Sequence, residues 1–400
     1  ESRFAELRAL CESAGYKVVA DFRQSREQPH PRTYLGPGKV REIAGLLGPL
    51  PVGLAVADGD LRPRQLKELE DTFGLPVADR TRLILELFSQ RARSQEGKLQ
   101  VRLAALKYTL SHLIGLGPEL SRLAGIVGTR GPGEPILRAE RRRLRRQIYN
   151  LETRMRRMAT RRSLARRRRQ ASEIPTVGIV GYTNAGKSTL LNALAAAEVL
   201  VDDRLFATLD PTSRVVGLPS GNRVIVTDTV GFIRDLPKDL LAAFRATIEE
   251  ATDADLLLHV VDVSHSSFRE HMAAVEEILK GLSCAGTPRI TLLNKVDLVS
   301  RLPAPGALSS PADGTVLFLS ALTGQGLSEL LATLDEAVAP ARYKQRVWVE
   351  YQNLGKIKAL LGKEGVLAEE LEDSGAWVTV QSTPKVLSRV LRLAKATREQ

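Results

Sequence analysis

The chain is short of cysteine and lacks any long apolar run. Its two cysteines, Cys11 and Cys284, lie far apart and match no zinc or redox spacing. A disulfide-stapled secreted domain and a thiolate metal site are therefore disfavoured. No run of about 18 apolar residues occurs, which argues against a membrane-spanning helix, and no signal peptide is visible. These absences predict a cytoplasmic protein.

Acidic residues are almost missing from residues 138–169. This segment holds fifteen arginines and two glutamates, a local net charge of +13, whereas the whole chain of 400 residues carries +12. All of the basic excess therefore lies in one place, as in proteins that bind nucleic-acid phosphates. Arginine rather than lysine favours bidentate phosphate contacts and stacking on bases.

Two apolar seams predict an antiparallel helical hairpin over residues 89–172. The seams repeat with a 4-3 spacing, at Leu99, Leu103, Leu106, Leu110 and Leu113 and then at Leu144, Ile148, Leu151, Met155 and Met158. Between them, residues 115–135 are rich in glycine and proline and predict a long tip loop whose backbone can approach a ligand closely. A coiled-coil hairpin with solvated arginines is the alternative. The predicted RNA contacts are Arg122, Arg130, Gly131, Gly133, Arg138, Arg141, Arg142 and Arg145.

A phosphate-binding loop of the form G-x-x-x-x-G-K-S occupies residues 181–188, between a strand-like run and a helix-like run. Its backbone N–H groups and the helix N-terminus would face a nucleotide phosphate. Lys187 would supply a point charge, and the Ser188 hydroxyl would bind Mg²⁺. The motif predicts a nucleotide-binding domain.

Guanine is indicated by the sequence N-K-x-D at residues 294–297. The Asp297 carboxylate can accept from N1–H and from the exocyclic amine of guanine, and adenine offers neither donor. The segment Ser320-Ala321-Leu322 follows an apolar run and would close over the base through backbone donors. Together the segments predict a GTP site.

Two further segments match the switches of such a domain. Asp228 ends a strand-like run and would hold Mg²⁺ through water, while Gly231 would place its N–H on the γ-phosphate. Residues 206–212 offer Thr208 or Thr212 as a second protein ligand to Mg²⁺, and we favour Thr208. Ser188 and Thr208 are thus the predicted metal ligands.

Phe232 stands where many small GTPases carry the glutamine that orients the attacking water, and a phenylalanine cannot do this. Hydrolysis by the chain alone should therefore be slow. The Asn184 carbonyl could bind K⁺ where an arginine finger would lie, or Asn184 could hydrogen-bond its own loop. We predict catalytic roles for Lys187, Thr208, Gly231 and Asn184.

The full set of predicted nucleotide contacts comes from five segments. They are Gly181, Tyr182, Thr183, Asn184, Ala185, Gly186, Lys187, Ser188, Phe206, Ala207, Thr208, Leu209, Asp210, Asp228, Thr229, Val230, Gly231, Asn294, Lys295, Val296, Asp297, Ser320, Ala321 and Leu322.

The predicted fold class is α/β. A P-loop GTPase domain at 173–340, with a mostly parallel sheet and flanking helices, follows a small α/β domain at 1–88 and the hairpin. A small α/β domain at 345–400 ends the chain. Within these domains, residues 16–22, 347–351 and 376–381 read as strands, and residues 39–47, 62–73, 354–361 and 384–393 read as helices.

These motifs together resemble the HflX family of translational GTPases. The similarity covers nearly the whole chain and is carried by residues 34–39, 79–85, 96–101, 128–134, 181–188, 206–212 and 228–232. It implies a cytoplasmic factor, which we expect to be a monomer, that binds the large ribosomal subunit and splits stalled or idle ribosomes, often under stress. It also implies that this subunit stimulates GTP hydrolysis and that the hairpin tip reaches rRNA near the peptidyl-transferase centre.

One segment departs from the family pattern. Where the family's tip continues Gly-Pro-Gly-Glu-Thr-Gln-Leu-Glu, this chain has Pro135, Ile136, Leu137 and Arg138 after Glu134. Pro135 removes a backbone donor and Arg138 reverses a charge, so the tip contacts can differ. A ribosome-assembly GTPase and an RNA-remodelling NTPase stay open as alternatives, while a P-loop metabolic kinase is disfavoured by N-K-x-D.

Overall fold

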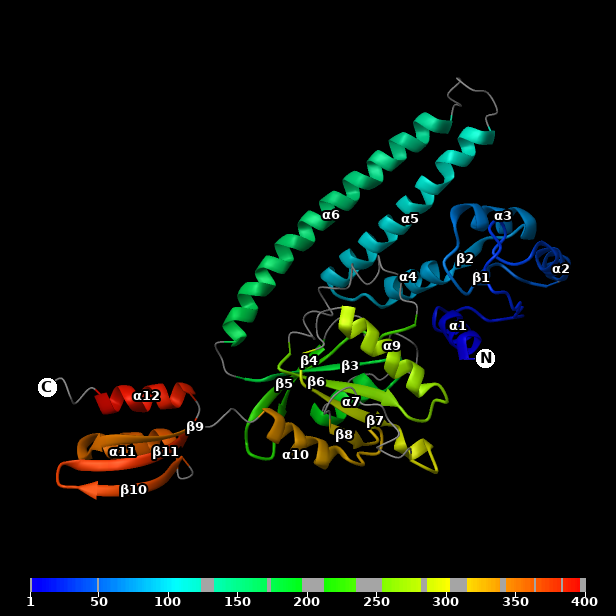
Figure 1. Cartoon of the computed structure of the whole chain (residues 1–400). Helices are drawn as coiled ribbons and strands as arrows, with labels where there is room; N and C mark the ends of the chain where they lie inside the picture. The colour runs from blue at the N-terminus through cyan, green and yellow to red at the C-terminus, as the bar shows by residue number, and fades with distance from the viewer. Residues whose placement is uncertain are drawn as a thin grey trace. The chain divides into compact units, whose positions relative to one another are not determined.

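The computed structural model forms two compact units, Glu1–Thr333 and Leu334–Gln400 (Figure 1). It describes residues 2–48, 50–123, 133–170, 174–195, 212–234, 254–281, 286–302, 315–338, 343–362, 365–382 and 384–395. No helix among these residues is long and apolar enough to cross a membrane.

A six-stranded sheet forms the centre of the first unit. Its order is β4-β5-β3-β6-β7-β8, with β4 antiparallel to β5 and every other pair parallel. The strands are β3 (Thr176–Gly181), β4 (Thr212–Gly217), β5 (Arg223–Asp228), β6 (Leu256–Asp262), β7 (Arg289–Asn294) and β8 (Thr315–Phe318). Mainly apolar strands such as β6 are buried, its single histidine included, as expected for parallel strands covered on both faces.

Helices connect these strands and carry the polar loops at their ends. They are α7 (Lys187–Ala195), α9 (Phe268–Gly281), the short 3-10 helix η1 (Val296–Leu298) and α10 (Leu327–Val338), inside which the boundary between the units falls. Because the parallel strands β3, β5, β6 and β7 end at one edge of the sheet, the segments that follow them can meet there. The predicted α/β P-loop fold is confirmed.

The N-terminal region is a small α/β arrangement. Its elements are α1 (Ser2–Ser13), α2 (Pro37–Leu47), β1 (Ala55–Ala57), α3 (Pro63–Phe73), β2 (Val77–Asp79) and α4 (Arg80–Arg91), with β1 and β2 parallel. The prediction of a strand at residues 16–22 was wrong, since this segment joins no ladder in the part of the chain described. An extended run without a neighbouring strand leaves its backbone groups to solvent.

The helical hairpin is confirmed as α5 (Gln95–Leu123) and α6 (Gly133–Gln170), which lie against each other (Figure 1). Leu103, Leu144 and Leu151 of the two seams are buried between them. Lys107 and Glu152 add an ion pair of 2.8 Å across the interface. The two apolar seams are therefore the packing surface.

The predicted tip loop was too long, because α5 continues through Leu123 and α6 already begins at Gly133. Pro118 in α5 lacks an N–H and leaves the Ile114 carbonyl without its helical donor. Arg141 of α6 donates to the Leu113 carbonyl at 2.8 Å and to the Ile114 carbonyl at 3.4 Å. This contact between the helices, together with cooperative elongation, lets the helix pass the proline.

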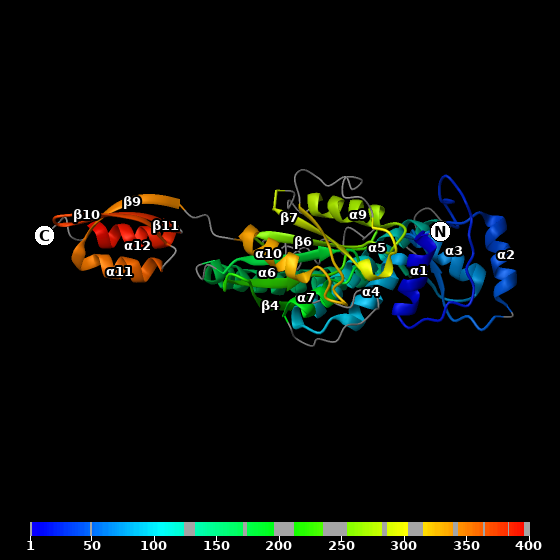
Figure 2. The same cartoon turned by 90° about the horizontal axis from the view of Figure 1, so that it is seen from below.

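The second unit holds a three-stranded antiparallel sheet of order β10-β11-β9, with two helices on one face (Figure 2). Its elements are β9 (Tyr343–Glu350), α11 (Tyr351–Leu361), β10 (Val366–Glu372), β11 (Gly375–Ser382) and α12 (Pro384–Lys395). The sequence analysis missed β10, since its three glutamates are weak strand formers. Pairing with β11 overrides that local preference.

Candidate nucleotide site

The phosphate loop lies between the end of β3 and the start of α7, where the helix N-terminus favours an anion. Gly186 has φ +91°, and a Cβ there would overlap the Asn294 amide. Gly181 has φ +156°, and a Cβ there would overlap the Val260 carbonyl oxygen. Both positions accept only glycine, so the path of the loop, which forms a cradle of backbone N–H groups, depends on these two residues.

Lys187 is buried at the base of this cradle, and its Nζ donates to the Tyr182 carbonyl at 2.7 Å. Burial lowers its pKa to about 8, with Asp228 opposing the shift. A buried ammonium with a backbone acceptor as its hydrogen-bond partner is well placed to exchange that partner for a phosphate oxygen.

The Mg²⁺ ligand predicted at Ser188 lies beside Asp228, and its Oγ donates to Asp228 Oδ2 at 2.7 Å. A hydroxyl and a carboxylate at the edge of the phosphate cradle are the oxygen donors that Mg²⁺ prefers. The residues present therefore fit the ion. Thr208 and the other residues of the first switch, Phe206, Ala207, Leu209 and Asp210, lie outside the described residues.

Asn294 joins the base-binding segments to the phosphate loop. Its Nδ2 donates to the Ala185 carbonyl at 2.8 Å, and its Oδ1 accepts from the Ala321 N–H at 2.9 Å. Ser320 is fully buried beside it, whereas Leu322 is exposed. One buried amide thus brings three of the predicted segments together.

Lys295 turns the chain with φ +65° and pairs with Asp262 at 2.7 Å. Val296 is buried and anchors η1, so that the next residue, Asp297, is exposed. None of the described residues hydrogen-bonds the Asp297 carboxylate. The carboxylate expected to bind guanine is therefore available to a ligand.

The second switch is bridged to the phosphate loop by backbone hydrogen bonds. Thr183 N–H donates to the Phe232 carbonyl at 2.7 Å, and Phe232 N–H donates to the Gly181 carbonyl at 3.0 Å. Gly231 lies so near Lys187 that a Cβ there would be 2.9 Å from its Nζ. Thr229 is also buried, with Oγ1 donating to the Ile179 carbonyl, and Val230 is buried beside it.

Phe232 itself points into a hydrophobic core, where it is 1% exposed. The same core contains Ile233 of the switch, Leu10 of α1 and Leu83 and Leu87 of α4. The residue that replaces the expected glutamine is thus an anchor between the switch and the N-terminal region, and its ring is not available to a water molecule.

Asn184 has φ +59° and an exposed side chain. No described residue hydrogen-bonds that side chain, so the alternative in which it binds its own loop finds no support among them. The left-handed backbone is itself one that asparagine tolerates better than most residues.

Sequence analysis missed a charged cluster that joins the phosphate loop to the N-terminal region. Arg80 pairs with Glu6 at 2.5 Å and with Asp58 at 2.9 Å, and it donates to the Arg234 carbonyl at 3.2 Å. Tyr182 Oη accepts from the Arg234 N–H at 2.8 Å. Arg80 lies in the segment 79–85 that carries the family similarity, but no spacing along the chain predicts its partners, because Glu6, Asp58 and Arg234 meet it only in the folded chain.

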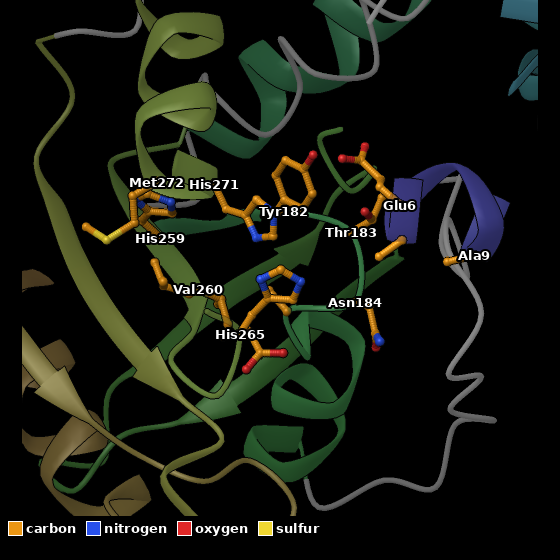
Figure 3. Close-up of a pocket in the computed structure, with 14 residues that line it drawn as sticks. Glu6, Ala9, Tyr182, Thr183, Asn184, His259, Val260, His265, His271 and Met272 are labelled. Atoms are coloured by element: carbon orange, nitrogen blue, oxygen red, sulfur yellow. The ribbon is translucent and has the colours of Figure 1, made fainter. Parts of the chain in front are cut away.

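A cavity of about 180 Å³ lies between α1, the phosphate loop and α9 (Figure 3). The ring of His271 stacks on Tyr182 at 3.9 Å and lies 4.5 Å from His265. Burial lowers the pKa of His271, like that of His259, to about 4, so both imidazoles are neutral at physiological pH. The described residues contain no cluster able to hold a metal ion here.

Most of the predicted RNA contacts in α6 are accessible. Arg138, Arg142 and Arg145 are exposed, while Arg141 is half-buried against α5. Arg122 and Gly133 lie within α5 and α6, and Arg130 and Gly131 lie outside the described residues. The basic face is therefore a property of α6, and Arg141 serves the hairpin's own packing.

Three family models match the chain. They are a GTP-binding GTPase N-terminal region at residues 1–89, a GTP-binding GTPase middle region at 91–169 and a 50S ribosome-binding GTPase at 176–295. Each model covers a segment that also differs in architecture: the N-terminal α/β region, the hairpin and the P-loop sheet.

Two relatives and one solved structure illustrate the similarity. The chain is 41% identical to the GTPase HflX of Caldanaerobacter subterraneus subsp. tengcongensis, over 98% of this chain and 90% of that protein. It is 40% identical to the GTPase HflX of Escherichia coli K12, over 84% and 78% respectively. A GTP-binding protein of Sulfolobus solfataricus in complex with GDP matches with 25% identity and a TM-score of 0.45, over 85% of this chain and 96% of that one.

Proposed function

The chain belongs to the HflX family of ribosome-associated GTPases, and on that premise we propose that it binds the large ribosomal subunit and dissociates stalled or idle ribosomes. It hydrolyses GTP to GDP and phosphate. We propose further that it acts as a cytoplasmic monomer under stress. The four proposed domains span residues 1–88, 89–172, 173–340 and 345–400.

The observation that carries this proposal is the burial of Phe232. The switch offers no side chain at this position to orient water, so the chain binds GTP with an incomplete catalytic site. An external activator would complete it. A ribosomal subunit suits this role because the basic excess lies on α6, a helix of 38 residues that is roughly 57 Å long.

The hairpin would bring this charge to rRNA. Arg138, Arg142 and Arg145 are exposed along α6 and would contact phosphates, whereas the proposed tip contacts would approach the peptidyl-transferase centre. Reversing two of these charges should therefore weaken binding, since each phosphate that is neutralised adds to the affinity.

Within the nucleotide site, we propose one role for each residue. Lys187 would bind the β- and γ-phosphates, and Gly231 N–H would bind the γ-phosphate. Ser188, with Thr208, would hold Mg²⁺, which neutralises phosphate charge when bound. GTP would thus order both switches, and hydrolysis would permit release from the ribosome. Subunit dissociation should then require bound GTP and not its cleavage.

GTP turnover with and without purified large subunits tests the proposal. We expect at least tenfold stimulation at fixed salt and saturating GTP, because the subunit completes the catalytic site. Small subunits serve as the control, and an Arg142→Glu/Arg145→Glu variant should show less stimulation while its unaided rate is unchanged. An equal rate with and without large subunits would contradict the proposal.

Light scattering of intact ribosomes separates the alternatives. Splitting of mature ribosomes by the GTP-bound chain, or with a non-hydrolysable analogue, supports the proposed function. Stimulated turnover without splitting favours a ribosome-assembly GTPase. RNA strand separation that persists in Lys187→Ala would favour an RNA-remodelling protein.

We also propose K⁺ as a cofactor bound by the exposed Asn184 side chain. K⁺ should raise the rate severalfold over Na⁺, and Asn184→Gly should abolish this difference. Glycine is the matched replacement because it keeps the φ of +59° without strain while it removes the side chain, its carbonyl included. A K⁺ effect that survives in Asn184→Gly would assign the cation to another ligand.

A further inference from the structure

The family models end at residue 295, so they assign nothing to the second unit. In this unit β10 is an edge strand, with β11 as its one neighbour among the described residues. Alternate residues of an edge strand direct their N–H and C=O groups away from the sheet. Such an edge is a template for another extended chain unless it is protected.

The side chains of two leucines on this edge are unusually exposed to solvent. Leu371 is 68% exposed and Leu367 is 46% exposed. Leu371 is in register with Ala376 and, through it, with Val349, and both of these are buried on the face that packs against α11 and α12. The two helices thus leave Leu371 uncovered at the edge of their own apolar face, although Lys358 of α11 reaches Glu369 on the same face.

The opposite face of the same edge is acidic. Glu370 is in register with Trp377 and Trp348, which lie on the face without helices. The Arg346 guanidinium lies 5.1 Å from the centre of the Trp377 ring and pairs with Glu370. Glu372 follows on this face, while the basic residues of the face, Arg346 and Lys344, lie on β9, on the other side of β11. Aromatic and arginine side chains of this kind are the ones that dominate protein–protein interfaces.

We propose that β10 binds an extended segment of a basic protein by strand addition. The segment would alternate basic residues, beside Glu370 and Glu372, with apolar residues, beside Leu371, because successive side chains of a strand point to opposite faces. Its main chain would pair with the free edge.

The charge of β10 favours a basic protein segment over two other possible partners, a second copy of the chain and RNA. Antiparallel pairing of β10 with a second copy of the chain would set glutamates against glutamates, which destabilises a sheet. RNA phosphates would meet Glu372 and Asp373, which make no ion pair with a described residue, whereas Glu369 and Glu370 are paired with Lys358 and Arg346. The inference deepens the proposed function and rests on it, since the partner is a protein of the large ribosomal subunit.

Binding of the full-length chain to purified large subunits tests the inference. We expect Leu371→Lys and Glu372→Lys each to raise the Kd at least fivefold, with unaided GTP turnover and the unfolding temperature unchanged. Ala359→Lys is the matched control, because Ala359 is an exposed residue of α11 in the same unit. A photo-reactive benzophenone amino acid at position 367 should cross-link to a protein.

The outcomes separate the two proposals. Variants that bind like the wild type, or cross-links confined to rRNA or to a second copy, overturn the assignment of β10 and leave the proposed function intact. A wild-type chain that fails to bind large subunits overturns both.

Discussion

An Asp297→Asn variant should lose GTP affinity by about 100-fold to 10,000-fold. The Asp297 carboxylate would accept two hydrogen bonds from guanine, and hydrogen bonds to a charged group contribute about 1.5–3 kcal/mol each. In the variant, the NH2 group of the asparagine side chain would also face a hydrogen-bond donor of guanine and could not accept from it. Because η1 is anchored by buried Val296 and Asp297 is exposed, the change should leave the fold intact.

The same variant should gain affinity for xanthosine triphosphate. Xanthine carries a carbonyl where guanine carries the exocyclic amine, and the asparagine amide can donate to it. Equilibrium binding of fluorescent GTP, competed with each nucleotide, measures both effects. Asp71→Asn in α3 is the control, since Asp71 is exposed and lies in the N-terminal region. GTP binding within threefold of the wild type would exclude Asp297 as the base ligand.

Arg80→Ala should lower the free energy of unfolding of the first unit by about 3–5 kcal/mol. The Arg80 side chain is 6% exposed and that of its partner Glu6 is 10% exposed. Burial lowers the pKa of Arg80, but Glu6 and Asp58 outweigh it and the pKa is raised, so the guanidinium stays charged. Alanine would leave the Glu6 carboxylate buried without its cation.

This loss should be measured by calorimetry or circular dichroism. Tryptophan fluorescence cannot report it, because both tryptophans of the chain, Trp348 and Trp377, lie in the other unit. Arg8→Ala is the control. Its pair with Asp21 is about half exposed and should contribute less than about 1 kcal/mol. Adding Glu6→Gln to Arg80→Ala should restore part of the stability, since it removes the uncompensated charge. A loss no larger than that of Arg8→Ala would contradict the argument.

The hairpin shows what the local sequence pattern could predict and what it could not. The seams at Leu103, Leu144 and Leu151 predicted two packed helices, because a 4-3 spacing places apolar side chains on one face. The length of the loop was overestimated, because glycine and proline show only a local tendency to end a helix and do not reveal contacts from the other helix. The Arg141 contact to the carbonyls near Pro118 comes from the other helix and has no local signal.

The sequence by itself determined the α/β GTPase fold and predicted the residues of the nucleotide site. The phosphate loop, N-K-x-D and the switch segment are local patterns whose residue types follow from phosphate, guanine and Mg²⁺, so their order predicts an α/β GTPase fold without coordinates. Only the tertiary structure decided how these segments are held. Asn294 joins the base loop to the phosphate loop, Phe232 packs into a core with α1 and α4, and Arg80 meets Glu6 and Arg234 across more than seventy residues. Such contacts depend on distance in space, and no spacing along the chain encodes them.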